Sequence, residues 1–168
     1  KKLKTFAQTE GDFDPKIFKL TMENVKRDKI LVQFKTLSST NAGVATTRLS
    51  DSKYKMRIVI HDKLDDRSRY SVLCHELAHI YLGHLGTDKD NWWPCRINLS
   101  HSTVEVEAEA VSYIVTLRVG LMSPSDSYLS SHLRGDGVPE SVSLELISKV
   151  AGKLAEMGKH VLPARKAK

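Results

Sequence analysis

The sequence contains few cysteines and no long apolar run. Cys74 and Cys95 are the two cysteines among its 168 residues, and neither belongs to a CxxC pair. Two isolated thiols cannot build the disulfide framework of a small secreted protein. No apolar stretch approaches the roughly 20 residues that a membrane span requires, and no signal-peptide pattern stands at the start. We therefore expect reduced cysteines, a cytoplasmic protein and no membrane partner.

The sequence also lacks an excess of charge in its central part. The formal net charge is +6, from 26 basic and 20 acidic residues. Without the six basic residues near the two ends, 20 basic residues face 20 acidic ones; the six are Lys1, Lys2, Lys4, Arg165, Lys166 and Lys168. This distribution favours solubilising ends over a nucleic-acid-binding face, although it leaves contact with nucleic acid open.

The remaining composition is that of an ordinary globular protein, with 40% hydrophobic and 27% charged residues. We expect one domain over residues 1–168, with a core over about 15–157. The last of the expected strands, YKMRIVIH, alternates cleanly, which indicates a half-buried strand at a sheet edge. Periodicity and turn residues predict an α+β fold, with helices at 15–28, 103–119, 125–134 and 140–157 and strands at 30–37, 44–49 and 54–61.

Residues 74–84, CHELAHIYLGH, bring three histidines and a glutamate into one short segment. His75 and His79 are four residues apart, so on a helix they lie on one face, one turn apart. Two imidazoles so placed can bind one Zn²⁺ ion, and Glu76 after the first histidine can act as general base. The alternative is a surface helix with two solvated histidines.

The residues around the motif predict that its helix is buried. On a helical wheel Leu73, Leu77 and Ile80 form one apolar stripe, and apolar residues also flank the histidine face. Histidines that face inward need polar partners. His84 falls on the leucine side, out of reach of the same metal, unless Gly83 ends the helix and lets His84 turn back. We therefore treat His84 as the weaker candidate ligand.

A third ligand is expected from the segment TVEVEAEAVSYIVTLRVG, which contains three acids. On the wheel Glu105 and Glu109 lie within an apolar surface, whereas Glu107 lies on the narrow polar face and is expected to face solvent. One of the two buried carboxylates would ligate the metal, and the other would accept a hydrogen bond from a ligand histidine. A capping box from Ser102 to Glu105 is the competing interpretation.

The loop GTDKDNWWPCRINLSH is long for a compact domain, and such loops are often functional. Trp92 and Trp93 in this loop could line a cleft. They could equally fold down as a small satellite core, which is the interpretation we favour. Cys95 is a minor candidate for a zinc ligand.

Three separated segments resemble the ImmA/IrrE-type metallopeptidase domain: the strand YKMRIVIH, the helix RSRYSVLCHELAHIYLGH and the helix EVEAEAVSYIV. The stretch INLSHSTVEVEAEAVSYIVTLRVGL, followed by SPSDSYLSSHL, is still more similar to the peptidase-like domain of the ArdC antirestriction group. The resemblance covers residues 50–134. It implies a zincin-like fold, in which a small, mostly antiparallel sheet packs on the HExxH helix and on a Glu-bearing helix.

The same resemblance implies a ligand set for the metal. It assigns Zn²⁺ to His75, His79 and Glu105, and it makes Glu76 the catalytic base. Glu109 stands where ImmA/IrrE members have Asn or Asp, in agreement with the ArdC-like variant, and would hold a ligand histidine. The ArdC group also has an N-terminal domain associated with single-stranded DNA, for which the residues before the match are too few.

From these features we expect a zinc-dependent metalloendopeptidase that acts on a specific protein or peptide. Glu76 would take a proton from the attacking water and pass it to the leaving amine, and an extended substrate would pair with the 54–61 strand. The alternative is a non-hydrolytic, metal-stabilised regulatory or antirestriction module. The candidate oxyanion donors are Tyr113, His101, His132 and His61, and the sequence ranks none of them above the others. The substrate and the oligomeric state are likewise left open.

Overall fold

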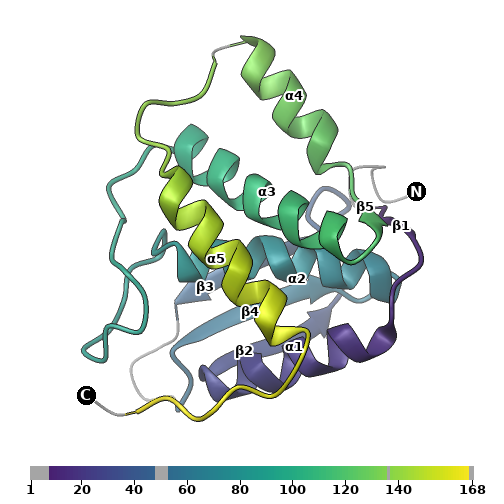
Figure 1. Ribbon diagram of the computed structural model, residues 1–168, viewed down its shortest axis with the longest axis vertical. Coiled ribbons are helices and arrows are strands. Elements are labelled where there is room, and N and C mark those ends of the chain that lie inside the picture. Colours follow the sequence, from purple (N-terminus) through teal and green to yellow (C-terminus); the bar gives the residue numbers. More distant parts are fainter. Residues whose placement is uncertain (1–7, 48–52, 136, 167–168) are drawn as a thin grey trace.

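The computed structural model describes residues 8–47, 53–135 and 137–166 (Figure 1). Its helices and small sheets confirm the expected α+β class. No helix in these ranges is long and apolar enough to cross a membrane. In chain order the elements are β1 (Glu10–Gly11), α1 (Pro15–Arg27), β2 (Ile30–Lys35), β3 (Gly43–Thr47), β4 (Met56–His61), α2 (Asp66–Tyr81), α3 (His101–Arg118), β5 (Leu121–Met122), α4 (Ser125–Gly135) and α5 (Leu144–Met157).

The main sheet has three strands in the order β2–β4–β3. β2 runs parallel to β4, and β3 runs antiparallel to it, so the sheet is mixed and not mostly antiparallel as expected. The expectation that the 54–61 strand lies at an edge is wrong, because β4 is hydrogen-bonded on both sides. The alternation of apolar and polar residues in β4 indicates which face of the strand is buried. It does not indicate whether the strand is paired on one side or on both. Of the expected 44–49 strand, residues 48 and 49 lie outside the described ranges.

Helix α2 packs against β3, β4 and α3, and its position decides where the motif lies. The side chain of Asp65 caps its start by accepting a hydrogen bond from the Ser68 backbone N–H at 2.9 Å. The predicted stripe of Leu73, Leu77 and Ile80 is fully buried, which confirms that α2 is a core helix. The solvated-histidine alternative is therefore wrong.

Helix α1 and the C-terminal segment are joined by buried polar contacts. The Asn24 side-chain amide donates to the carbonyls of Met157 and His160, both at 2.9 Å, and its oxygen accepts from the Leu162 backbone N–H at 2.8 Å. Arg165 forms two hydrogen bonds with the buried carboxylate of Asp28, at 2.9 and 3.0 Å. Arg165, counted above among the charges near the ends, is thus packed onto the core.

The long loop after α2 folds down beside β4. The Trp93 indole N–H donates to the Gly86 carbonyl at 2.8 Å, and its ring packs edge-on against Tyr81. Lys55 forms ion pairs with Asp88 and Asp90 of the loop and lies over the Trp92 ring. The two tryptophans fold down as favoured, but Trp93 belongs to the main core, with Trp92 packed against that core, and neither lines the cleft described below.

Candidate metal centre

Helix α2 carries the two motif histidines on the face toward α3. The Nε2 atoms of His75 and His79 are 3.1 Å apart, and both side chains are mostly buried. Because the residues are one turn apart, the helix itself sets this separation. The two Nε2 atoms thus face one point, as the sequence spacing predicted.

Helix α3 brings Glu105 to the same point. Its Oε1 lies 3.3 Å from His79 Nε2, and its Oε2 lies 3.7 Å from His75 Nε2. The capping-box alternative is wrong, because α3 begins two residues earlier: Ser100 is its N-cap and accepts from the Thr103 backbone N–H. Glu105 is therefore available to the histidines. Among the described residues these three are the group whose ligand atoms lie close enough together, all within 4.8 Å, to hold a metal ion.

Glu109, one turn further along α3, lies behind His75. Its Oε1 is 3.1 Å from His75 Nδ1, the ring nitrogen that faces away from the ligand cluster. Burial alone would lower the pKa of His75, but the hydrogen bond to Glu109 and the charges of Glu76 and Glu105 raise it to about 9. The carboxylates around this imidazole thus stabilise positive charge, which is the electrostatic setting that a cation needs.

Glu76 is buried beside the ligand cluster, under the start of β3. Burial raises the pKa of its carboxyl above the ordinary value, although the charges of His75 and His79 oppose the shift. A Cβ on Gly43 would overlap Val72 and lie 3.3 Å from the Glu76 carboxylate, so only glycine allows β3 this close. Glu76 is thus a carboxylate of raised basicity in a fixed position.

A cleft of two adjoining cavities, of about 420 and 650 Å³, opens at the cluster. One arm carries the hydroxyl side chains of Thr40, Ser71, Ser112 and Ser125. The other arm carries the aliphatic side chains of Leu85, Ile97, Leu99 and Val104. Six residues line both arms and so mark the centre of the cleft: Asn41, Gly43, His75, Glu76, Glu105 and Tyr128.

Tyr128 of α4 was not among the candidates from sequence. It lines both arms, and the pKa of its hydroxyl is raised by partial burial and by the charges of Glu105 and Glu109. Of the four oxyanion candidates only His101 borders the cleft, while His61 and Tyr113 line neither arm and the side chain of His132 lies outside the described atoms. Neither periodicity nor residue spacing predicted that α4 would border the cleft.

The expectation about Glu107 is wrong. Glu107 is not solvent-facing: it is 0% exposed, because Arg96, His84 and the start of α5 cover the face of α3 that looked polar on the wheel. For His84 the structure shows the alternative that the sequence left open. Gly83, with φ of +80°, ends α2 and turns the chain back, so that His84 Nδ1 lies 2.9 Å from His79 Nδ1. His84 contacts the back of His79 and lies outside the ligand group.

The family comparison agrees with this geometry. The model of the IrrE N-terminal-like domain, Peptidase_M78, matches residues 25–111, which is more than half of the chain. The chain therefore belongs to this family of metallopeptidases, and the ImmA/IrrE-type resemblance is confirmed. The matched range contains the histidines, Glu76, Glu105 and Glu109. No curated protein and no solved structure gave a significant match.

Proposed function

We propose that the protein is a zinc-dependent endopeptidase with a zincin-like fold. His75, His79 and Glu105 bind Zn²⁺, Glu76 is the general base, and Glu109 orients His75. The observation that carries the proposal is the meeting of three ligand atoms from α2 and α3 beside a buried carboxylate in an open cleft. A family of metallopeptidases gives the reaction class.

The distances between the ligand atoms suit zinc. Ligand atoms bound at about 2.0–2.1 Å in a tetrahedron lie about 3.3–3.4 Å from one another. The separation of the two Nε2 atoms, 3.1 Å, and that of His79 Nε2 from Glu105 Oε1, 3.3 Å, are close to that value, and one ligand atom from each of the three residues lies within 4.8 Å of the others. Two imidazoles, one carboxylate and one open position are also the donor set of a catalytic zinc site, and the open side here faces the cleft.

The chemistry of the residues follows from their positions. A bound zinc ion supplies a Lewis acid for the scissile carbonyl and lowers the pKa of the attacking water. Glu76 accepts the proton of that water and returns it to the leaving amine, and its raised pKa makes it a better proton acceptor than an exposed carboxylate. Tyr128 keeps its proton and donates a hydrogen bond to the carbonyl oxygen as negative charge develops there.

The substrate is an extended peptide that pairs with β3. β3 is the outer strand on the cleft side of the three-stranded sheet, and its residues Gly43, Val44 and Ala45 line the larger arm. An unpaired strand edge recognises extended peptides through its backbone groups. The assignment of this role to the 54–61 strand is wrong, because β4 is already paired on both sides. The two arms would take an aliphatic side chain on one side of the scissile bond and a small polar one on the other.

The ArdC-like variant of the family is the finer part of the proposal. It rests on the segment SPSDSYLSSHL, which lies beyond the matched range and supplies Tyr128 from α4. A second carboxylate at position 109 fits the same variant, since Glu109 reaches His75 directly. The competing proposal is a metal-stabilised antirestriction or regulatory module that does not hydrolyse peptides.

Zinc binding is the first test. We expect one zinc per chain by elemental analysis after zinc loading and dialysis, and loss of that zinc in His75→Ala and in Glu105→Gln. Glu145→Gln, an isosteric change at an exposed position of α5, is the matched control and should keep full loading. A protein that stays metal-free would refute the zinc site. Zinc loading without cleavage of any peptide displayed in a substrate library would favour the non-hydrolytic module.

A further inference from the structure

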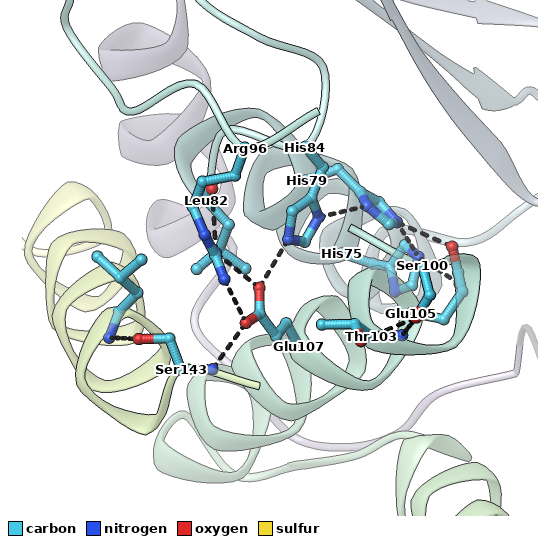
Figure 2. Close-up of polar contacts among 11 residues, drawn as sticks. His75, His79, Leu82, His84, Arg96, Ser100, Thr103, Glu105, Glu107 and Ser143 are labelled. Atoms are coloured by element: carbon cyan, nitrogen blue, oxygen red, sulfur yellow. Dashed lines mark hydrogen bonds and ion pairs between the residues drawn. The ribbon is translucent and has the colours of Figure 1, made fainter. Parts of the chain in front are cut away.

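A chain of buried hydrogen bonds runs away from the metal centre behind His79 (Figure 2). His79 Nδ1 lies 2.9 Å from His84 Nδ1, and His84 Nε2 lies 2.7 Å from Glu107 Oε2. Glu107 in turn accepts two hydrogen bonds from the Arg96 guanidinium, at 2.7 and 2.8 Å, and one from the Ser143 backbone N–H at 2.8 Å. Two of the partners, His79 and Glu107, lie on the facing helices α2 and α3.

The protons along this chain can be placed in one consistent way. Glu107 is held ionised by Arg96 and is therefore an acceptor, so His84 must carry its proton on Nε2. A neutral His84 with that proton has a lone pair on Nδ1. This lone pair accepts the proton of His79 Nδ1, which leaves the lone pair of His79 on Nε2, the atom that faces His75 and Glu105.

Burial and backbone geometry hold the chain in place. The His84 side chain is 3% exposed and the Glu107 side chain is 0% exposed, so water does not compete for these bonds. The turn that places His84 needs Gly83, where a Cβ would overlap the Pro94 carbonyl. The Arg96 backbone N–H donates to the Gly83 carbonyl at 2.8 Å. The residue whose guanidinium keeps Glu107 ionised therefore also stabilises the turn.

We propose that His84 and Glu107 are positioning residues for the metal, acting through His79. Glu107 fixes the tautomer of His84, and His84 fixes the tautomer and the ring orientation of His79. The two ligand histidines are thus oriented in different ways. Glu109 contacts His75 directly, whereas His79 contacts the neutral imidazole of His84, which in turn is hydrogen-bonded to Glu107. This inference rests on the zinc site proposed above.

Three substitutions at position 84 separate the two hydrogen bonds. Asn places its side-chain oxygen near the position of His Nδ1 and can accept from His79, whereas Gln places its amide near Nε2 and can donate to Glu107 but not accept from His79. Leu does neither. We measure zinc affinity by competition with a chromogenic chelator, and the melting temperature of each metal-free variant as a control for folding.

We expect His84→Leu and His84→Gln to weaken zinc binding about 10–100-fold, the range typical of groups that orient a metal ligand. His84→Asn should recover most of the affinity. Melting temperatures should follow a different order, with His84→Gln closer to the parent than His84→Leu, because Glu107 keeps its donor. Equal zinc affinities in the Asn and Gln variants, or affinities that only follow the melting temperature, would overturn the positioning role. A parent protein that binds no zinc would overturn the metal site as well.

Discussion

Asp28 and Glu105 are both carboxylates packed between core elements, but they meet different partners. Asp28 is fully buried and is matched by Arg27, Arg165 and Lys153, with a further hydrogen bond from the Tyr81 hydroxyl at 2.7 Å. In the part of the chain that the structure describes, the ion-pair partners of Glu105 are the two motif histidines, and its side chain is 24% exposed to the cleft. Asp28 is matched by arginine and lysine side chains within the fold, whereas Glu105 faces imidazoles and the open cleft.

The same contrast separates the other acids of α3. Glu107 has an arginine, an imidazole and a backbone N–H around it, and these hold its pKa at about 2 although burial alone would raise it. Glu109 pairs with His75 of α2 and also forms a hydrogen bond with Ser125. Acids that gather around imidazoles at an open cleft can offer ligand atoms to a cation, whereas acids that face arginine are already paired within the fold. The partner of an acid thus distinguishes a ligand site from a structural ion pair better than its burial does.

The largest expected effect is on catalysis through Glu76. Glu76→Gln should lower the cleavage rate by about 10²–10⁴-fold or more, since the amide cannot accept the proton of the attacking water. Zinc loading and the melting temperature should stay as in the parent, because Glu76 lies beside the ligand group in the cleft and is not part of that group. The measurement is turnover of any substrate that the parent cleaves. Undiminished turnover would show that the mechanism is wrong.

A smaller loss is expected at Tyr128. Tyr128→Phe removes the hydroxyl above Glu105 and Glu109 but keeps the ring, so kcat should fall by about 10²-fold, within the range for one oxyanion donor, while KM changes little. Zinc affinity should not change. Steady-state kinetics on the same substrate separate the two constants. A change confined to KM would mean that Tyr128 holds the peptide and does not stabilise the oxyanion.

The parts of the site that the sequence predicted are those that depend on one helix at a time. The spacing of His75 and His79 on α2, and of Glu105 and Glu109 on α3, survives any arrangement of the helices around them. The sequence failed at Glu107, because a helical wheel shows which residues share a face but not what covers that face. Here an arginine from a loop and the start of α5 covered it.

The fold was predicted to a similar extent and for similar reasons. The expected helix at 15–28 agrees closely with α1, because its start depends on a local residue, Pro15. The central place of β4 and the reach of α4 over the cleft depend on pairing and packing between distant segments. The same applies to the turn at Gly83, whose consequence for His84 depends on the Pro94 segment that packs against it.

Asp28 belongs to a structural ion-pair cluster, so Asp28→Asn should lower the free energy of unfolding without changing the zinc affinity. Burial alone would raise the pKa of Asp28, but Arg165, Lys153 and Tyr81 lower it from 3.8 to about 2. A shift of that size corresponds to about 2 kcal/mol of folding free energy at neutral pH. Urea unfolding at pH 7 measures the loss, and chelator competition should show parent-like zinc affinity. An Asp28→Asn variant that lost zinc at unchanged stability would show that Asp28 acts on the metal site as Glu105 does, against the proposed difference between the two acids.

The smallest expected effect is the pH dependence of the stability loss in Asp28→Asn. A group whose pKa is lowered by folding stabilises the protein fully above its unfolded pKa, here 3.8, and the contribution disappears as the pH falls through the folded value of about 2. The stability difference between the parent and Asp28→Asn should therefore shrink from about 2 kcal/mol at neutral pH to about 1 kcal/mol at pH 3. Urea unfolding of metal-free parent and variant at pH 7, 5, 4 and 3 gives the difference directly. The absence of metal removes any contribution from pH-dependent zinc binding, and the titration of the ligand residues is common to both proteins and cancels. A difference that stayed constant down to pH 3 would mean that Asp28 acts through shape and hydrogen bonding, with its charge contributing nothing.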